Sequence, residues 1–142
     1  MTCPDAWIVD DSATARRLIE AIIGLAGFSA RGFETGADAA RAIVSADPPP
    51  AVAILDMQMP GLDGCQTARA LRLAEYDGPI ALFSACRGPA LTRRALRSGV
   101  DEILHKDAGY ESLRNYLSEI TNREAADPSS ADAAPPAATQ AR

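Results

Sequence analysis

The sequence lacks any apolar stretch close to the roughly 18 residues that a membrane-spanning helix requires. Its N-terminus has neither the basic start nor the apolar core of a secretory signal, so we expect a cytoplasmic protein that does not insert into a membrane. Positive charge is also in short supply, because 14 basic residues face 19 acidic ones and the net charge is -5. This balance argues against nucleic acid as a direct partner, since binding to its phosphates recruits an excess of lysine and arginine.

Cysteine is scarce as well. The three residues Cys3, Cys65 and Cys86 are an odd number, and they stand at wide, unpatterned spacings. Reduced thiols fit this pattern better than a disulfide framework or a zinc site does. With 142 residues, the chain has the length of one ordinary domain, whose core is stable without cross-links.

Short apolar runs alternate with longer segments of helical periodicity, and the alternation repeats five times. The runs predict strands in residues 6–11, 28–34, 51–56, 79–85 and 100–106, and the periodic segments predict helices in residues 12–27, 35–46, 64–76, 89–99 and 110–120. Runs such as 51–55 are apolar at every position, as strands buried on both faces of a parallel sheet must be. Five β-α pairs with right-handed crossovers give an α/β domain with a doubly wound parallel sheet.

Local signals mark the helix ends. Ser12 is a suitable N-cap for the first helix, and Gly27 is a suitable C-terminal stop. Thr35, with Asp38 three residues later, resembles a capping box at the start of the second helix. The first helix is expected to turn one apolar face inward, made of Leu18, Ile19, Ile22, Ile23 and Ala26.

The composition changes near the C-terminus. Residues 123–142 are rich in Ala, Pro and Ser and show no apolar periodicity, so they cannot bury enough surface to offset the entropy lost on ordering. We therefore predict a folded domain in residues 1–122, followed by a disordered tail or linker in residues 123–142.

Five polar side chains fall at the carboxyl ends of predicted strands, the edge where doubly wound sheets bind ligands. They are Asp10 and Asp11 after the first strand, Asp56 at the end of the third, Ser84 near the end of the fourth, and Lys106 at the end of the fifth. Carboxylates with a hydroxyl and an ammonium suit a hard cation such as Mg²⁺ together with an oxyanion. A carboxylate can also attack phosphorus, and on this interpretation Asp56 is a nucleophile.

Each of these residues also has an ordinary structural interpretation. The acidic pair could cap a helix, Asp56 could belong to the Met-Pro-Gly turn that follows it, and Lys106 could be a solvated charge at a strand end. Those interpretations give no reason for four strand ends to carry residues of matching chemistry. The shared location therefore favours a phosphoryl-transfer site.

Together these features resemble the receiver domain of two-component response regulators over about residues 5–121. The resemblance rests on the pair Asp10-Asp11, the segment LDMQMPGLDG that contains Asp56, the dipeptide Ser84-Ala85, and Lys106 at the end of the fifth strand. It implies the flavodoxin-like receiver fold, with five helices and the strand order 2-1-3-4-5. It also implies a stand-alone phosphoacceptor switch in place of an enzyme. Such a switch accepts a phosphoryl group from a histidine kinase or phosphotransfer protein and then binds a downstream protein target.

The resemblance also assigns a role to each residue of the edge. Asp56 would accept the phosphoryl group. The ligands of Mg²⁺ would come from Asp10, Asp11, Asp56 and the backbone carbonyl of Gln58, and Asp11 would bind the metal directly. Ser84 would hydrogen-bond to the phosphoryl group, and Lys106 would pair with it.

Two positions depart from the family pattern. Ile103 stands three residues before Lys106, where many receivers carry an aromatic side chain whose rotamer reports phosphorylation. Asp107 replaces the proline that usually follows the lysine, and it could cap the last helix. In place of an aromatic rotamer change, we expect movement of residues 84–89 to alter the packing of Ile103.

The predicted output face combines Ile103 and Tyr110 with a basic patch made of Arg93, Arg94 and Arg97. Because the rest of the chain is acidic, this patch suits an acidic partner protein.

Two alternatives to the phosphoacceptor switch remain open. One is a receiver-like interaction module that signals without phosphate, which the missing aromatic residue allows and the intact acidic set argues against. The other is a metal-dependent phosphatase with an aspartyl nucleophile, although Gln58 occupies the position where that chemistry usually has a second Asp. The Ala/Pro-rich segment would serve as a linker if the parent protein is longer.

Overall fold

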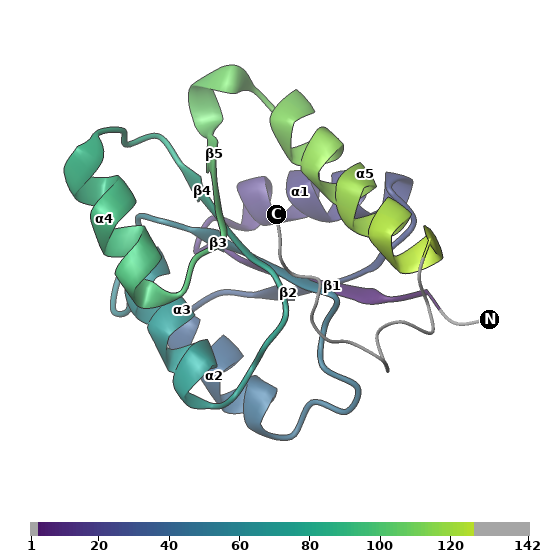
Figure 1. Ribbon diagram of the computed structural model, residues 1–142, viewed down its shortest axis with the longest axis horizontal. Helices are drawn as coiled ribbons and strands as arrows, with labels where there is room; N and C mark the ends of the chain where they lie inside the picture. Colours follow the sequence, from purple (N-terminus) through teal and green to yellow (C-terminus); the bar gives the residue numbers. More distant parts are fainter. Residues whose placement is uncertain (1–2, 127–142) are drawn as a thin grey trace.

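Five parallel strands form one sheet with the order β2-β1-β3-β4-β5 (Figure 1). The computed structural model of the chain describes residues 3–126. The strands are β1 (Asp5–Val9), β2 (Ser29–Phe33), β3 (Val52–Asp56), β4 (Ile80–Ser84) and β5 (Glu102–His105). The helices are α1 (Ala13–Leu25), α2 (Gly36–Val44), α3 (Gly64–Leu73), α4 (Pro89–Ser98) and α5 (Glu111–Ala126), with a short 3-10 helix η1 (Lys106–Ala108) after β5. This architecture confirms the doubly wound α/β fold and the strand order that the resemblance implied.

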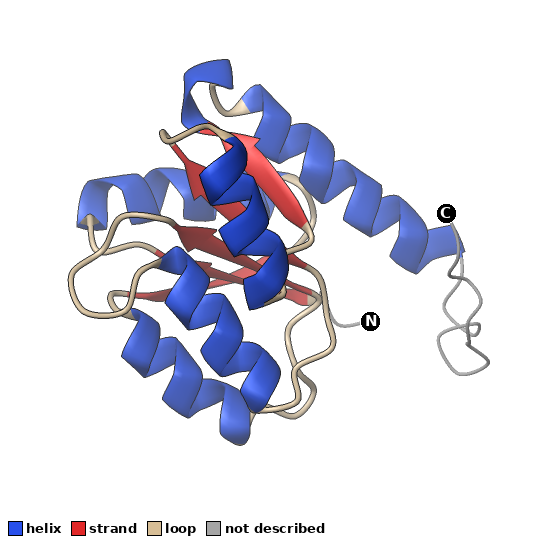
Figure 2. Ribbon diagram, turned by 60° about the vertical axis from the view of Figure 1, so that its left-hand side comes forward, coloured by secondary structure: helices blue, strands red, loops and turns tan. Residues whose placement is uncertain are grey.

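Helices cover both faces of the sheet. The first face carries α1 and α5, and the second carries α2, α3 and α4 (Figures 1 and 2). β3 and β4 are buried at every position, which explains their continuous apolar sequence. Each large side chain buried in these layers contributes about 1.5–3 kcal/mol, so the central strands are the best anchored part of the sheet. Among the helices of residues 3–126, none has the length and apolar character needed to cross a bilayer.

The predicted helix starts are correct in position but differ in one detail. The Ser12 hydroxyl accepts a hydrogen bond from the Ala15 N–H at 3.2 Å, as an N-cap should. Thr35 likewise accepts from the Asp38 N–H at 3.0 Å. The Asp38 carboxylate pairs with Arg41 instead of returning to Thr35, so the second half of the predicted capping box is wrong. A complete capping box lies at the start of α3 instead.

The structure differs from the prediction in two places, namely the apolar face of α1 and the end of α5. Leu18 is 45% exposed, because the buried stripe of α1 is narrow and begins at Ile19. α5 continues to Ala126, four residues past the predicted end of the domain at residue 122. The sequence Arg-Glu-Ala-Ala at this point has high helix propensity, which explains the extension. The remainder of the predicted tail lies outside the described residues.

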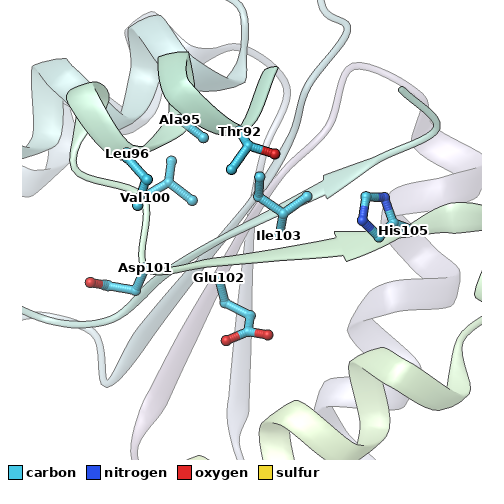
Figure 3. A pocket seen from close by; sticks show the side chains of 8 residues that line it. All are labelled: Thr92, Ala95, Leu96, Val100, Asp101, Glu102, Ile103 and His105. Carbon is cyan, nitrogen blue, oxygen red and sulfur yellow. The ribbon is translucent and has the colours of Figure 1, made fainter. Parts of the chain in front are cut away.

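A shallow pocket separates α4 from the edge strand β5 (Figure 3). Its volume is about 280 Å³. Ile103 points from β5 toward Thr92 of α4, and His105 lies farther along the same strand. Because Leu96 on α4 is 66% exposed, the pocket has an apolar rim.

Candidate functional site

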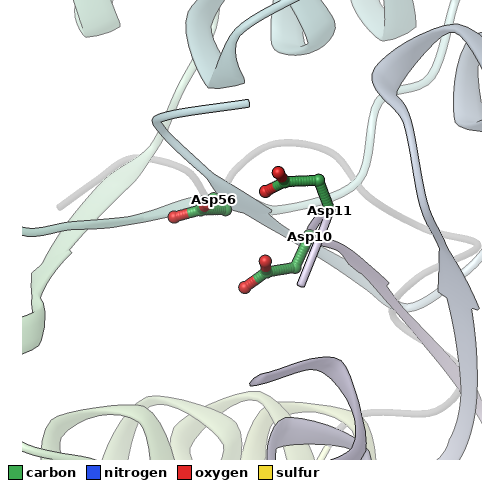
Figure 4. Close-up of side chains that lie close together, drawn as sticks. All are labelled: Asp10, Asp11 and Asp56. Carbon is green, nitrogen blue, oxygen red and sulfur yellow. The ribbon is translucent and has the colours of Figure 1, made fainter. Parts of the chain in front are cut away.

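Three carboxylates gather at the carboxyl edge of the sheet (Figure 4). Asp10 and Asp11 directly follow β1, and Asp56 is the last residue of the neighbouring strand β3. Each side chain offers an oxygen atom, and these atoms lie within 4.8 Å of one another. Asp10 and Asp56 are buried, whereas Asp11 is exposed. The parallel pairing of β1 with β3 therefore assembles the acidic cluster that the sequence predicted.

Asp10 is fixed in place and carries an unused acceptor. Its N–H donates to the Phe33 carbonyl at 3.1 Å, and its Oδ1 accepts from the Ser12 N–H at 2.9 Å. Its other carboxylate oxygen, Oδ2, is buried and has no hydrogen-bond partner within residues 3–126. A buried carboxylate oxygen without a partner is costly, and a cation placed at the cluster would relieve this cost.

Lys106 supplies the positive charge nearest to Asp56. Its Nζ donates to Asp56 Oδ1 at 2.7 Å, and the two side chains are 37% and 7% exposed respectively. The same Nζ lies 5.6 Å from the ring centroid of Phe83, a favourable distance for a cation–π contact. The structure therefore joins the carboxylate of β3 to the lysine that follows β5, with β4 between them.

The surroundings of Asp56 oppose its ionisation. Burial raises the pKa of its carboxyl group above the ordinary value, and repulsion from Asp10 and Asp11 adds to the rise. The hydrogen bond and the charge of Lys106 lower this pKa, but they offset the rise only in part. The ionised carboxylate is therefore a destabilised group that gains from any further positive charge or electrophile placed beside it.

Ser84 ends β4 and is fully buried. Its hydroxyl accepts a hydrogen bond from the Cys86 N–H at 2.9 Å and lies 3.3 Å from the Cys86 carbonyl, to which it donates. Strand pairing sets Asp56 opposite Phe83, the residue before Ser84. The hydroxyl must leave Cys86 before it can donate to a group bound at Asp56.

A glycine allows α3 to begin directly against the end of β3. A β-carbon on Gly64 would lie 2.7 Å from the Asp56 carbonyl oxygen and 2.5 Å from the side chain of Leu82. The Gly64 N–H also donates to the Met57 carbonyl at 2.9 Å. The absence of a side chain thus permits the close approach, and the hydrogen bond fixes the start of α3 to the residue that follows Asp56.

The oxygen atoms around the cluster suit a hard cation. Gln58 is exposed in the loop after Asp56, and its carbonyl accepts no hydrogen bond from the described part of the chain. Carboxylate and carbonyl oxygens, completed by water, are the ligands that Mg²⁺ prefers. The unpartnered Asp10 Oδ2 and the repulsion among the three acids are both relieved by such an ion, so these residues fit a Mg²⁺ site.

The predicted basic patch is smaller than expected. Arg94 Nη2 donates to Asp63 Oδ2 at 2.7 Å and thereby ties α4 to the start of α3. Arg93 and Arg97 are exposed, and they remain on the outer surface of α4. Asp63 also forms the capping box of α3 with Gln66. Their spacing in the sequence could have revealed the capping box, but not the contact with Arg94, which is 31 residues away.

The other two residues of the predicted output face lie on opposite sides of the sheet. Ile103 packs in the core beneath α2, α3 and α4. The Tyr110 ring lies 5.8 Å from the ring of Phe83, a residue of the core beneath α1 and α5. Because β5 is the edge strand, a surface that wraps around this edge can still include both residues, and their joint output face with the basic patch stays a prediction.

An ion pair joins the two loops that follow Ser84 and Lys106. Arg87 Nη2 lies 2.8 Å from Asp107 Oδ1, and Arg87 Nε donates to Asp107 Oδ2 at 3.1 Å. Asp107 lies in η1 and does not cap α5, which begins at Glu111. No sequence pattern signals this pair, because its members are 20 residues apart in separate loops. Both side chains are more than half exposed, so water screens the pair and its contribution to stability is small.

Comparison with known proteins identifies relatives across most of the chain. A sequence model of the response regulator receiver domain matches residues 6–118. Response regulator MprA of Mycolicibacterium vanbaalenii is 30% identical over 127 residues, which cover 89% of this chain and 54% of that protein. This chain spans about half the length, or less, of the curated relatives that it matches.

Solved structures share the fold. The signal receiver domain of NarL from Mycobacterium tuberculosis matches with a TM-score of 0.70 and 29% identity, covering 89% of this chain and 99% of that one. Chemotaxis protein CheY4 of Vibrio cholerae matches with a TM-score of 0.75, over 84% of this chain and 99% of that one. Its identity is 22%, so this second likeness shows the fold alone.

Replacing Asp56 with Asn should raise the melting temperature of the metal-free chain at neutral pH. Because the pKa of Asp56 is raised in the folded state, the folded chain binds more protons than the unfolded one between the ordinary pKa of 3.8 and the raised value. The protonated Asp56 carboxyl therefore adds to the free energy of unfolding at low pH, and this contribution is lost as the pH rises through that window. Asparagine cannot ionise, so Asp56→Asn should remove the loss. Thermal unfolding with a chelator at roughly pH 4 to pH 8 measures the effect. Asp77→Asn, an exposed acid at the opposite edge of the sheet, is the control. A lower melting temperature for Asp56→Asn at neutral pH would contradict this account.

Mg²⁺ should stabilise the wild-type chain. A ligand that binds only the folded state at 100 times its Kd raises the free energy of unfolding by about 2.7 kcal/mol. Asp11→Ala should abolish this gain, whereas Asp77→Ala should keep it. Thermal melting with MgCl₂ against chelator makes the comparison, and a wild-type melting temperature indifferent to millimolar Mg²⁺ would count against the site.

Proposed function

The chain belongs to the response regulator receiver domain family, and on that basis we propose that it is a phosphoacceptor signalling switch whose acceptor is Asp56. The observation that carries the proposal is the setting of this carboxylate. It is buried at the end of β3, bonded to Lys106 at 2.7 Å, and close to two further acids. The donor is the phosphohistidine of a histidine kinase or of a phosphotransfer protein.

In the transfer step, a carboxylate oxygen of Asp56 forms a bond to phosphorus while the bond from phosphorus to the imidazole nitrogen breaks. The imidazole leaves with the electron pair and a solvent proton. Lys106 holds Asp56 Oδ1 before transfer and is then within reach of the phosphoryl oxygens attached there. Hydrolysis by water later returns the free carboxylate and inorganic phosphate.

Asp10, Asp11, Asp56 and the Gln58 carbonyl would hold Mg²⁺. When bound, the ion neutralises charge on the acids and on the phosphoryl oxygens. The chain's own contribution is a rigid frame for these oxygens. The Asp10 N–H bond to Phe33 and the close approach of Gly64 to Asp56 supply that frame.

The phosphoryl group changes the surface through Ser84. Its hydroxyl leaves the Cys86 backbone and donates to a phosphoryl oxygen, which releases the β4-α4 loop from this contact and allows the loop to rearrange. That loop leads into α4, whose inner side meets Ile103 at the shallow pocket. Movement there alters the surface that carries Arg93 and Arg97, and an acidic downstream protein fits that surface.

A phosphate-independent interaction module is the second candidate. The observation in its favour is Ile103, which cannot act as an aromatic rotamer switch. An aspartyl-nucleophile phosphatase fits less well, because Gln58 replaces the second acid which that chemistry uses for proton transfer. The switch and the phosphatase both use Asp56 as the nucleophile. They differ in whether the phosphoryl group persists on Asp56 long enough to be detected.

Phosphoramidate, which carries a phosphorus–nitrogen bond, should add one phosphoryl group to the wild-type chain in the presence of Mg²⁺. The adduct should be absent from Asp56→Asn and should form normally on Asp77→Asn. Intact-mass spectrometry measures the occupancy. If the wild-type chain gains no phosphoryl group, or if Asp56→Asn gains it equally, the phosphoacceptor proposal fails.

Phosphorylation should alter amide hydrogen exchange mainly in residues 85–105, which span the β4-α4 loop, α4 and β5. The reason is that the Ser84 hydroxyl, which is hydrogen-bonded to Cys86 in this loop, is the group that we expect to move first. Exchange is compared between the phosphorylated wild-type chain and Asp56→Asn treated in the same way. Changes that fall mainly on α1 and α2 would show that the output surface lies elsewhere.

A further inference from the structure

A side chain of α1 reaches back to the acidic pair. The guanidinium of Arg16 donates from Nη1 to the backbone carbonyl of Asp10 at 2.7 Å. Arg16 is half-buried, whereas Arg17 is exposed and makes no side-chain hydrogen bond within residues 3–126. The motifs that identify the site do not include either arginine.

A glycine on β2 leaves space for the Arg16 side chain. Gly32 of β2 lies beneath the Arg16 side chain, and a β-carbon on it would lie 3.1 Å from Arg16 Cδ and 2.3 Å from Glu20 Oε2. Those distances are closer than a side chain at this position allows without displacing its neighbours. Glycine at residue 32 therefore leaves the space that the side chains of Arg16 and Glu20 occupy against β2.

The contact fixes the link between the two acids. The Asp10 carbonyl belongs to the peptide that joins Asp10 to Asp11, so a hydrogen bond to this oxygen sets the plane of that peptide. The Asp10 N–H and Oδ1 are already held by Phe33 and Ser12. With the carbonyl held as well, the Asp10 oxygen without a hydrogen-bond partner within residues 3–126 is the buried Oδ2.

We propose that Arg16 is a positioning residue for the metal site and acts through the Asp10–Asp11 peptide. The inference rests on the proposed function, because it concerns the same site. Partners that orient metal ligands in this way commonly change metal affinity 10- to 100-fold when they are removed, and roughly tenfold is expected for Arg16.

The direction of the effect separates positioning from simple electrostatics. Arg16 is a cation, so removing it should strengthen Mg²⁺ binding if charge alone matters. If Arg16 positions Asp10 and Asp11, removing it should weaken binding. Arg17→Gln removes an equal charge one residue away and measures the electrostatic part.

Isothermal titration of the folded, full-length chain with MgCl₂ tests the inference. Arg16→Gln should raise the Kd for Mg²⁺ about tenfold. Arg16→Lys, which keeps a donor, should recover part of the affinity, and Arg17→Gln should leave the Kd unchanged or slightly lower. Saturating Mg²⁺ should restore the phosphorylation of Arg16→Gln by phosphoramidate to the wild-type rate, as expected when only metal affinity is lost.

Gly32→Val provides an independent route to the same contact. The valine side chain should displace Arg16 and raise the Kd in the wild-type background, but it should add no further loss to Arg16→Gln. An equal additional loss in both backgrounds would show that Gly32 acts by another path and would overturn this part of the account.

The outcomes distinguish the inference from the function on which it rests. If the wild-type chain binds Mg²⁺ and accepts a phosphoryl group while Arg16→Gln binds Mg²⁺ as tightly or more tightly, the positioning role is wrong and the proposed function stands. An equal loss in Arg17→Gln would also overturn it. If the wild-type chain binds no Mg²⁺, the metal site of the proposed function fails and the inference fails with it.

Discussion

Repulsion among three carboxylates within 4.8 Å is the constraint on which the rest of this site depends. Within the described chain, the nearest compensation is the ammonium of Lys106, which binds Asp56 at 2.7 Å yet leaves its pKa raised. The Asp10 oxygen without a partner marks the charge that the chain does not satisfy by itself. A site in this condition gains stability from a cation and reactivity toward an electrophile. The same imbalance therefore accounts for both the metal and the phosphoryl group that we propose.

The fold maintains this unfavourable arrangement because the backbone around it is rigid. β3 is buried at every position, and Gly64 allows α3 to press against the Asp56 carbonyl. On the other side, the two peptides that flank Asp10 are both held, the first through the Asp10 N–H by Phe33 and the second through the Asp10 carbonyl by Arg16. The burial of the two apolar layers supplies the free energy that opposes the repulsion. The change that we propose falls on the β4-α4 loop, because the Ser84 hydroxyl is hydrogen-bonded to the backbone of Cys86 alone within residues 3–126.

The sequence predicted the strands and the edge residues because both follow from local pattern. Continuous apolar runs mark buried parallel strands, and the polar residue that ends each run must lie at the common edge. The strand order came from the resemblance, since periodicity does not say which strands are neighbours. The contacts of Arg16 with Asp10 and of Arg94 with Asp63 were missed because they depend on where whole helices lie. Leu18 was wrongly placed in the core for a similar reason, as helical spacing gives the side of a helix but not the width of its buried stripe.

A crystal structure of the chain with Mg²⁺ and beryllium trifluoride, a mimic of the phosphoryl group, tests the central claim most directly. The account predicts beryllium bonded to an Asp56 carboxylate oxygen and Mg²⁺ coordinated by Asp11 and Asp56. Lys106 Nζ should then contact fluorine, and the Ser84 hydroxyl should have turned away from Cys86 toward another fluorine. A structure in which Asp56 carries no adduct, or in which an adduct forms while Ser84 stays on Cys86 and Lys106 makes no contact with it, would contradict the account.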